Sequence, residues 1–293
     1  MKTVITVILY NKEIIDSVTV HSLSQLFTPS DCVLNIISNG PKKVSFDSMV
    51  IEKLKDKFVA LDFDEYLENK PLSMIYNDSF SKYRECERFI FFDDDTIVSE
   101  EFLDVLLDDI AGKSYDLKIP RIIEKDIELT CYPLVNDKVY TGVIPKNIND
   151  DKVFSIGSGL VVYKSLIDKF MCFGFDVFDE RFALYGVDFS LFRRLELLKK
   201  KGVKFNISIC GTLKHSLSSS EESISEWRYK ERLIDLILSV KYYSSSKFLF
   251  SYMTLKIILK DIIKKRGRNL RLIFDIFHKG EHPRCTIFKS VSK

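Results

Sequence analysis

The chain has 293 residues, of which 46% are hydrophobic and 29% are charged, and its mean hydropathy is −0.01. These proportions are typical of a folded globular protein with a sizeable core. They exclude an intrinsically disordered chain, a collagen-like repeat and a small disulfide scaffold. The length fits one large domain, or one domain with an appendage.

The formal net charge of +2 conceals an uneven distribution along the chain. Residues 241–293 contain 13 Lys or Arg and 3 Asp or Glu, a net charge of +10, which leaves −8 for residues 1–240. A basic tail on an acidic body suggests that the two parts face different partners. The alternative is that the basic residues only form the solvated faces of helices.

The six cysteines show neither CxxC nor Cys/His ligand spacing, which argues against a zinc site and favours free thiols. No signal-peptide cleavage site follows the short apolar run at the N-terminus. No apolar stretch reaches the roughly 18 residues that a membrane span requires. We therefore expect a protein of the reducing cytoplasm.

The first hundred residues alternate between short apolar runs and segments of helical periodicity. We expect strands at residues 4–9, 33–37, 58–61 and 89–92, and helices at residues 12–27, 45–57 and 71–87. This alternation predicts a parallel sheet with crossover helices. Because ligands bind at the carboxyl ends of such strands, Asn11, Asn39 and residues 93–95 are expected at the binding edge.

The remainder of the chain is less regular. Residues 99–110 predict an amphipathic helix capped by Ser99. Residues 113–153 predict a second, smaller sheet with short strands such as residues 117–119. Further elements are expected as a strand at residues 203–209 and amphipathic helices at residues 186–201, 226–243, 252–265 and 270–277.

Three consecutive aspartates, Asp93, Asp94 and Asp95, form the most informative motif. Clustered carboxylates repel one another, so they cost stability unless a positive group lies among them. The apolar run before them predicts that they sit on the rigid end of a strand. Carboxylates at alternate positions can share a divalent cation, which can in turn bind the oxygens of a diphosphate.

Two other interpretations of the triplet are open. It can be an acidic turn that only caps the following helix. It can also be the nucleophile motif of a haloacid-dehalogenase-like phosphohydrolase, D-x-D-x-Thr/Val. That motif usually lies on the first strand, whereas 92 residues precede Asp93 here, and its last position is occupied by Ile97.

Several sequence blocks, in order over roughly residues 3–240, resemble glycosyltransferase family 2, the inverting enzymes with the GT-A fold. The resemblance is closest to the rhamnosyltransferase-like and galactofuranosyltransferase-like members that build bacterial surface polysaccharides. The blocks are residues 4–12 (VITVILYNK), 36–40 (IISNG), 69–77 (NKPLSMIYN), 89–103 (FIFFDDDTIVSEEFL), 156–162 (IGSGLVV), 174–195 (GFDVFDERFALYGVDFSLFRRL) and 215–216 (HS).

The resemblance implies an α/β GT-A fold, a Rossmann-like mixed sheet flanked by helices. Residues 1–240 would form the transferase domain, with a nucleotide-sugar-binding half in residues 1–100 and an acceptor half in residues 101–240. Residues 241–293 would be a basic C-terminal extension of amphipathic helices.

The resemblance also implies a metal-dependent reaction with a nucleotide-sugar donor. Asp93, Asp95 and His215 would bind Mn²⁺ or Mg²⁺. The donor, a UDP- or dTDP-linked sugar, would contact Tyr10, Asn11, Asn39, Asp93, Asp94, Arg228 and Arg232, with Asp94 at the ribose.

Asp188 matches the last acid of the family's Gly-Glu-Asp motif and would be the general base. An inverting transfer needs one carboxylate to take the proton of the attacking hydroxyl. Asp188 can also serve as the N-cap of the following helix. The acceptor side would include Gly157, Ser158, Gly159, Tyr185 and Trp227.

The chain departs from the family pattern at three places. Ser38 replaces the Asp that reads the pyrimidine ring, Val187 replaces the Glu beside the base, and residues 70–71 (KP) replace the usual Gly. These departures leave a non-catalytic nucleotide-sugar-binding scaffold as an alternative to an enzyme.

The basic tail suggests a protein on the inner face of the cytoplasmic membrane. Residues 255–277 intersperse Lys and Arg with apolar residues, and cationic amphipathic helices bind anionic membranes. The resemblance implies a lipid-linked oligosaccharide acceptor, in O-antigen or capsular polysaccharide synthesis. The acidic body argues against nucleic acid as a partner, and the sequence is compatible with a homodimer.

Overall fold

The computed structural model describes residues 2–26, 31–45, 48–107, 114–125, 127–216, 225–265 and 267–291. The chain forms two compact units. The first comprises Met1–Asn69, Asp78–Val177 and Arg194–Ser220, and the second comprises Lys70–Asn77, Phe178–Arg193 and Glu221–Lys293.

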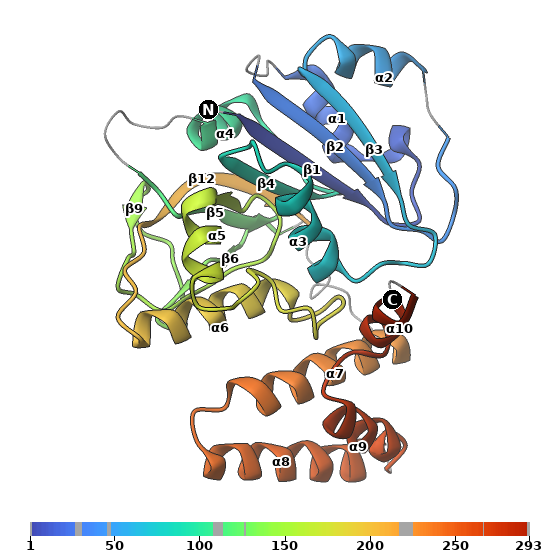
Figure 1. Cartoon of the computed structure of the whole chain (residues 1–293), viewed down its shortest axis with the longest axis vertical. Coiled ribbons are helices and arrows are strands. Elements are labelled where there is room, and N and C mark those ends of the chain that lie inside the picture. Colours follow the sequence, from blue (N-terminus) through green and yellow to red (C-terminus); the bar gives the residue numbers. More distant parts are fainter. Residues whose placement is uncertain are drawn as a thin grey trace. The chain divides into compact units, whose positions relative to one another are not determined.

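Four parallel strands form one half of the sheet in the first unit: β1 (Thr3–Leu9), β2 (Cys32–Ser38), β3 (Ala60–Glu65) and β4 (Arg88–Asp93). They lie in the order β3-β2-β1-β4 (Figure 1). Every residue of β1 is buried, as expected for a β-branched strand covered on both faces. Three of the expected strands are confirmed. The third expected strand begins at Ala60, because the Phe58 amide still donates to the Leu54 carbonyl at the end of the preceding helix.

Helices connect these strands, as the sequence predicts. They are η1 (Ile14–Asp16), α1 (Val18–Gln25), α2 (Ser48–Lys55), α3 (Leu72–Lys82) and α4 (Glu100–Leu107). The single helix expected over residues 12–27 is divided, because the Ser17 side chain accepts a hydrogen bond from the Val20 amide and starts α1 there.

The core beneath α1 and α2 follows the two-residue period of the strands. Alternate residues of β1, among them Ile5 and Val7, share one buried cluster with Val20 of α1 and Leu54 of α2. Because successive side chains of a strand point to opposite faces, this set covers one face of the sheet. The remaining face receives the Phe80 ring of α3, which packs edge-on against Phe89 at 4.9 Å between ring centroids.

The other half of the sheet is mixed. Strand β11 (Val161–Tyr163) lies antiparallel between β4 and β5 (Leu117–Glu124), and β12 (Ile207–His215) lies parallel to β5. The short strands β9 (Lys146–Asn147) and β6 (Thr130–Tyr132) complete a nine-stranded sheet. The strand expected at residues 203–209 therefore begins later and runs to His215.

A separate three-stranded sheet lies within residues 134–154 and consists of β7 (Leu134–Val135), β8 (Lys138–Val139) and β10 (Val153–Phe154). The sequence predicted such a sheet but placed residues 117–119 in it, which is wrong. The strand that contains them is mostly buried and pairs with both β11 and β12, so it belongs to the main sheet. Helix α5 (Lys164–Met171) follows β11, and α6 (Val187–Lys200) confirms the helix expected at residues 186–201.

The C-terminal part of the second unit is helical: α7 (Glu226–Tyr243), α8 (Lys247–Lys265), α9 (Leu270–Lys279) and α10 (Pro283–Val291). Ser225 caps α7 by accepting a hydrogen bond from the Arg228 amide. Gly280 ends α9 in a left-handed conformation, and any side chain there would meet the Tyr242 hydroxyl at 2.3 Å. The sequence predicted α7 to the residue, started α8 too late and missed α10.

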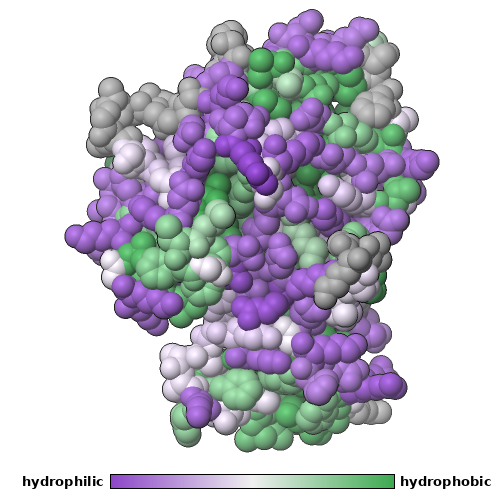
Figure 2. Space-filling view, in the orientation of Figure 1, coloured by the Kyte–Doolittle hydropathy of each residue, from purple (hydrophilic) through white to green (hydrophobic). Residues whose placement is uncertain are grey.

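Helices α7 and α9 pack against each other, and Ile237 and Leu238 of α7 and Ile273 and Ile276 of α9 are buried. None of the described helices has both the length and the apolarity needed to cross a bilayer. Hydrophobic side chains nevertheless reach the surface of this unit, at the bottom of Figure 2.

Candidate functional site

The carboxyl ends of the parallel strands meet at one edge of the sheet. The register pairs Leu9 with Ser38 and Ile8 with Asp93, so the residues after these strands are neighbours. The Asn39 amide donates to the Leu9 carbonyl, and the Asn11 amide donates to the Gly40 carbonyl, each at 2.8 Å. The predicted binding edge is therefore formed as the alternation of strands and helices implied.

Gly40 is needed in this edge for a geometric reason. Its φ is +62°, and a Cβ there would lie 2.4 Å from the Leu67 carbonyl oxygen. Asn11 also has a positive φ, of 51°, a conformation that asparagine tolerates better than most residues. Tyr10, just before it, is 50% exposed at the tip of β1. Asn39 is buried, and its side-chain amide donates to Asn69 Oδ1 at 3.2 Å.

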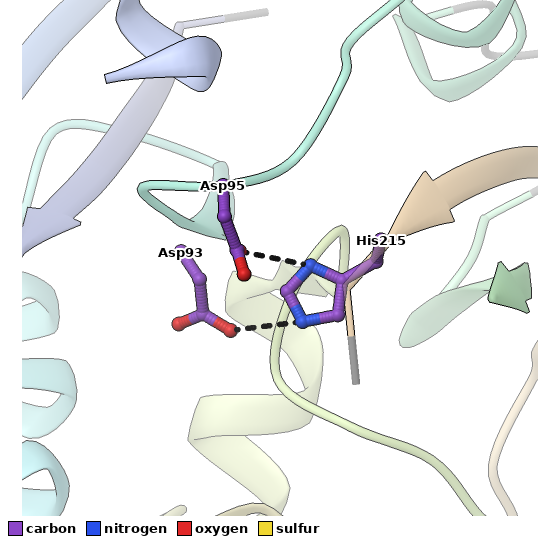
Figure 3. Close-up of side chains that lie close together, drawn as sticks. All are labelled: Asp93, Asp95 and His215. Carbon is purple, nitrogen blue, oxygen red and sulfur yellow. Dashed lines mark ion pairs between the residues drawn. The ribbon is translucent and has the colours of Figure 1, made fainter. Parts of the chain in front are cut away.

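Asp93, Asp95 and His215 converge on one point, although 120 residues separate the acids from the imidazole (Figure 3). His215 Nδ1 lies 3.1 Å from Asp95 Oδ1, and His215 Nε2 lies 3.7 Å from Asp93 Oδ2. One ligand atom from each of the three lies within 4.8 Å of the others. Asp93 ends β4 and His215 ends β12, so the sheet fixes the backbone of these two residues, and Asp95 lies in the turn that follows β4.

A network of buried hydroxyls supports this cluster. Thr96 Oγ1 lies 3.0 Å from His215 Nδ1 and 2.7 Å from Ser158 Oγ. The Ser158 hydroxyl accepts a hydrogen bond from the Asp93 amide at 3.2 Å. Thr19 Oγ1 accepts from the Thr96 amide and donates to the Asp93 carbonyl at 2.5 Å. Positioning groups of this kind orient ligands and limit their motion.

The charges in the cluster are strongly coupled. Desolvation raises the pKa of Asp93 to about 6, an effect that His215 opposes and that Asp95 and Asp94 reinforce. Desolvation would also raise the pKa of Asp95, but the imidazole outweighs it and lowers that pKa below its ordinary value. Burial opposes a charged His215, yet the two carboxylates outweigh it and raise the pKa of the imidazole.

The donor set fits a divalent cation. The side chains of Asp93 and Asp95 are 43% and 35% exposed, so the cluster opens to solvent, whereas that of His215 is only 8% exposed. Asp95 Oδ1 is a buried carboxylate oxygen that lies 3.1 Å from His215 Nδ1. Two carboxylates with an imidazole suit Mn²⁺ or Mg²⁺ better than a thiol-ligated metal.

Asp94 points to a different environment from its neighbours. Its carboxylate forms an ion pair with Lys12 and accepts a hydrogen bond from the Tyr10 amide at 3.1 Å. These contacts tie the loop after β1 to the loop after β4. The role at the ribose that the family resemblance implies for Asp94 stays a prediction.

Ser158 and its neighbouring glycines were expected on the acceptor side, and that role stays a prediction. The structure also gives Ser158 a direct part in supporting the acid cluster, through Asp93 and Thr96. Gly159 has a φ of +80°, and a Cβ there would meet Leu213 and Pro120 at 2.9 Å, so this turn requires glycine. Gly157 lies directly before them, and its carbonyl accepts from the Leu160 amide.

Asp188 lies in the first turn of α6, in the second compact unit. The turn before it is tightly defined. Gly186 has a φ of +80°, and a Cβ there would lie 2.0 Å from Asp235 Oδ1. The Ser190 hydroxyl donates to the Val187 carbonyl at 2.6 Å and accepts from the Asp179 amide. Because Asp188 and the acid cluster belong to different units, its part in the reaction stays a prediction.

The other candidates of the second unit lie on or near α7. The Arg232 guanidinium lies 5.3 Å from the centroid of the Tyr185 ring, a cation–π contact. Trp227 is 51% exposed near the start of the helix, beside Arg228. The donor and acceptor roles that the resemblance implies for these residues stay predictions.

Sequence reasoning did not identify Thr19 or Thr96 as members of the site. Thr96 directly follows the acidic triplet, and this adjacency is the one sequence feature that indicates a place in the site. Thr19 lies near the start of α1, and no sequence feature indicates a role in the site, because threonines on buried helix faces are common. Only the sheet topology brings the two hydroxyls together beneath Asp93.

No family model matches this chain, and no curated protein matches it either. Solved structures do. Staphylococcus aureus TarS matches with a TM-score of 0.51 at 12% identity, over 97% of this chain and 50% of that one, so this chain spans about half the length of TarS. TarS 1–349 gives 0.49 at 12% identity over 92% and 74% of the two chains, and its complex with UDP-GlcNAc gives 0.47 at 13% identity over 97% and 83%.

The chain has a GT-A-like glycosyltransferase fold. A central, mostly parallel sheet flanked by helices matches that architecture, as the family resemblance implied. At such low sequence identity the likeness shows the fold alone, and chemistry has to be argued from the residues of the site.

Proposed function

We propose that this protein is a metal-dependent, inverting glycosyltransferase that uses a nucleotide-sugar donor. One observation supports this above all others. In a glycosyltransferase fold, Asp93, Asp95 and His215 meet at the carboxyl edge of the sheet, with one ligand atom of each within 4.8 Å of the others. That edge is where α/β sheets bind their ligands.

Asp93, Asp95 and His215 would hold a Mn²⁺ or Mg²⁺ ion. A divalent cation there would supply positive charge for the diphosphate leaving group of the donor. The protein's own contribution is a rigid, partly desolvated donor set, since the hydroxyl network fixes His215 and Asp93 before any ligand arrives.

The nucleotide would lie along the same edge. Tyr10 provides an exposed aromatic ring, and Asn11 and Asn39 provide amide groups, at the carboxyl ends of β1 and β2. The Asp94 carboxylate joins this edge by accepting a hydrogen bond from the Tyr10 amide. With Ser38 at the end of β2 instead of aspartate, the uracil or thymine contact would rest on weaker, neutral hydrogen bonds. The donor would be a UDP- or dTDP-linked sugar.

Asp188 would act as the general base. It would accept the proton of the acceptor hydroxyl while that oxygen attacks the anomeric carbon and the bond to the diphosphate breaks, so that inversion follows from a single displacement. Gly157, Gly159, Tyr185 and Trp227 would form the acceptor side, with Arg228 and Arg232 available for phosphates. The acceptor would be a lipid-linked oligosaccharide of O-antigen or capsule synthesis, used at the inner face of the cytoplasmic membrane.

Ligand binding tests the metal claim directly. The melting temperature of the purified chain is measured with a panel of nucleoside diphosphates and nucleotide sugars, each with Mn²⁺, with Mg²⁺ or with a chelator. We expect stabilisation by one nucleotide class only when the metal is present. Asp95→Asn should abolish that stabilisation, whereas Asp104→Asn, an exposed carboxylate on α4, should keep it.

Equal nucleotide affinity with and without metal, or full binding by Asp95→Asn, would overturn the metal site. A non-catalytic scaffold would bind nucleotide sugar with metal and release no nucleoside diphosphate with any acceptor. A phosphohydrolase would release inorganic phosphate from simple phosphoesters, which a colorimetric assay detects.

A further inference from the structure

Helix α8 presents apolar side chains on two opposite faces. On its inward face Ile257 is buried, and the Phe250 ring packs edge-on against Phe277 of α9 at 6.0 Å between centroids. On its outward face six large apolar side chains are between 46% and 82% exposed. This outer stripe consists of Phe248, Tyr252, Leu255, Leu259, Ile262 and Ile263.

The outer stripe is continuous along the helix. Its first five members are separated by four, three, four and three residues, so one side chain recurs on the same face at each turn, and Ile263 directly follows the fifth. The helix has 19 residues, which corresponds to a length of about 28 Å. An exposed apolar strip of this kind marks an interaction surface more often than isolated exposed residues do.

A row of lysines flanks the stripe. Lys256, Lys260 and Lys264 follow one another at four-residue spacing and share a shallow groove with Leu259 and other members of the stripe. None of the three forms an ion pair with any residue in the described ranges. The acid of this helix, Asp261, is buried on the inward face.

Asp261 is already used inside the unit. Its carboxylate accepts hydrogen bonds from the Asn269 amide at 3.0 Å and from the Asn269 side chain at 2.7 Å. Asp261 therefore stabilises the turn before α9 and does not pair with the lysine row. The charges of that row are available to an external partner.

The chemistry of this face selects among occupants. A second copy of the same face would bring two rows of lysine together, and opposed like charges cost free energy in an interface. A nucleic acid would satisfy the lysines but leave the apolar stripe without a partner. An anionic bilayer satisfies both, because its acyl boundary accepts apolar side chains while its headgroups pair with lysine.

We propose that the outer stripe of α8 docks this protein on an anionic lipid surface. The helix lies flat in the headgroup region, the six apolar side chains enter the acyl boundary, and the lysine row pairs with lipid phosphates. Lying flat agrees with the lysines along its length, which prevent it from spanning the bilayer. The proposal names the surface behind the membrane location in the proposed function, and its test does not depend on transfer activity.

Vesicle co-sedimentation of the full chain tests the apolar part of the surface. Vesicles of phosphatidylglycerol and phosphatidylcholine should pellet the wild type, and the double variant Leu259→Asp, Ile263→Asp should partition at least tenfold less. Val143→Asp is the matched control, because it places the same charge at an apolar residue that is 85% exposed in the first unit. Equal pelleting of wild type and double variant would overturn the proposal.

The lysine row is tested separately. The triple variant Lys256→Gln, Lys260→Gln, Lys264→Gln should lose about fivefold in partition coefficient per lysine on anionic vesicles, or about a hundredfold in all. Vesicles of phosphatidylcholine alone should bind the wild type weakly, and raising the salt from about 0.1 M to 0.5 M should weaken anionic binding. Binding that ignores headgroup charge and salt would contradict the assigned role of the lysines.

A fluorescence measurement places the stripe at the lipid. Leu255→Trp in a Trp227→Phe background leaves one tryptophan on the outer stripe, and its emission should shift to shorter wavelength when anionic vesicles are added. No shift in a protein that pellets with the vesicles would assign docking to another surface. Loss of a dimer in the Leu259→Asp, Ile263→Asp variant, seen by sedimentation velocity without lipid, would overturn the proposal in favour of a second copy.

Discussion

The two units of this protein handle charge in opposite ways. In the first, acids gather at the end of a strand, where both Asp93 and Asp95 face one imidazole, that of His215. In the second, buried acids are paired inside the unit, as Asp179 is with Arg181 and Glu231 with Arg284, while lysines of α8 face outward. We expect each unit to meet its ligand where like charges gather, at the acid cluster in the first and at the lysine row in the second.

This contrast separates acids that serve a ligand from acids that serve the fold. Substitution of the first kind should change binding or turnover and leave the free energy of unfolding nearly unchanged. Substitution of the second kind should do the reverse. Three substitutions probe that distinction, and we take them from the largest expected effect to the smallest.

Asp188 is the sharpest case, because it belongs to the second unit but is predicted to serve the reaction. Asp188→Asn should lower the release of nucleoside diphosphate from the donor by about 10²–10⁴-fold, since the amide cannot take a proton. Nucleotide affinity measured by titration should stay within twofold of wild type. Asp168→Asn, an exposed carboxylate of α5, is the control and should be fully active.

Full turnover by Asp188→Asn would remove the residue from the role of base. A drop in melting temperature without a loss of turnover per folded molecule would place Asp188 with the structural acids of its unit.

Thr96→Val removes the hydroxyl that contacts both His215 and Ser158 while preserving the shape of the side chain. Metal-dependent nucleotide affinity should fall by about 10–100-fold, because the imidazole and the turn before β11 lose their orienting partner. Isothermal titration calorimetry with nucleotide in the presence of Mn²⁺ measures this affinity. The control is Thr6→Val, a fully buried threonine of β1 whose hydroxyl has no partner among the described residues.

If Thr96→Val and Thr6→Val give the same nucleotide affinity, the hydroxyl network does not position the cluster. If both lose stability equally and only Thr96→Val loses affinity, the network acts on the ligand site, as the contrast between the units requires.

Much of the first unit could be predicted from the sequence. The runs at residues 4–9, 33–37 and 89–92 are short and apolar, and they alternate with helical segments. They therefore predicted the parallel sheet, its carboxyl edge and the position of the acids on that edge. His215 was expected near them only through the family resemblance. Its placement depends on a bulge in β12, where the register shifts between Ile209 and Thr212 around Gly211.

Other features could not be read from one sequence. Periodicity does not say which sheet a strand joins, so residues 117–119 were assigned to the wrong one. The segment of α10 is short and only partly apolar, and its helix is held by contacts to distant parts of the chain, such as Arg284 donating to Glu231 of α7 at 3.0 Å. A helix with apolar residues on two opposite faces, such as α8, cannot be told from an ordinary amphipathic helix by its sequence, because the sequence does not show which face is buried.

Glu231, in the second unit, is an acid that we expect to stabilise the fold and to have no part in ligand binding. Its side chain, 11% exposed, accepts hydrogen bonds from Arg284 Nη2 at 3.0 Å and His282 Nε2 at 3.2 Å. Burial would raise the pKa of Glu231, but His282 and Arg284 outweigh it and hold that pKa below its ordinary value. Glu231→Gln should therefore lower the free energy of unfolding at pH 7 by about 1.5 kcal/mol and leave nucleotide affinity unchanged.

The pH dependence of that loss follows from linkage. A carboxylate whose pKa is lower in the folded chain stabilises the fold above its unfolded pKa, and this contribution disappears as the pH falls through the folded value. The difference in free energy of unfolding between wild type and Glu231→Gln, measured with urea, should thus be largest at pH 7. It should decrease progressively below about pH 4.3, the pKa of glutamate in the unfolded chain. Glu226→Gln, at an exposed carboxylate paired with Lys230, is the control and should show a much smaller difference. A difference for Glu231→Gln that is constant across this pH range would mean that shape, and not charge, makes Glu231 structural.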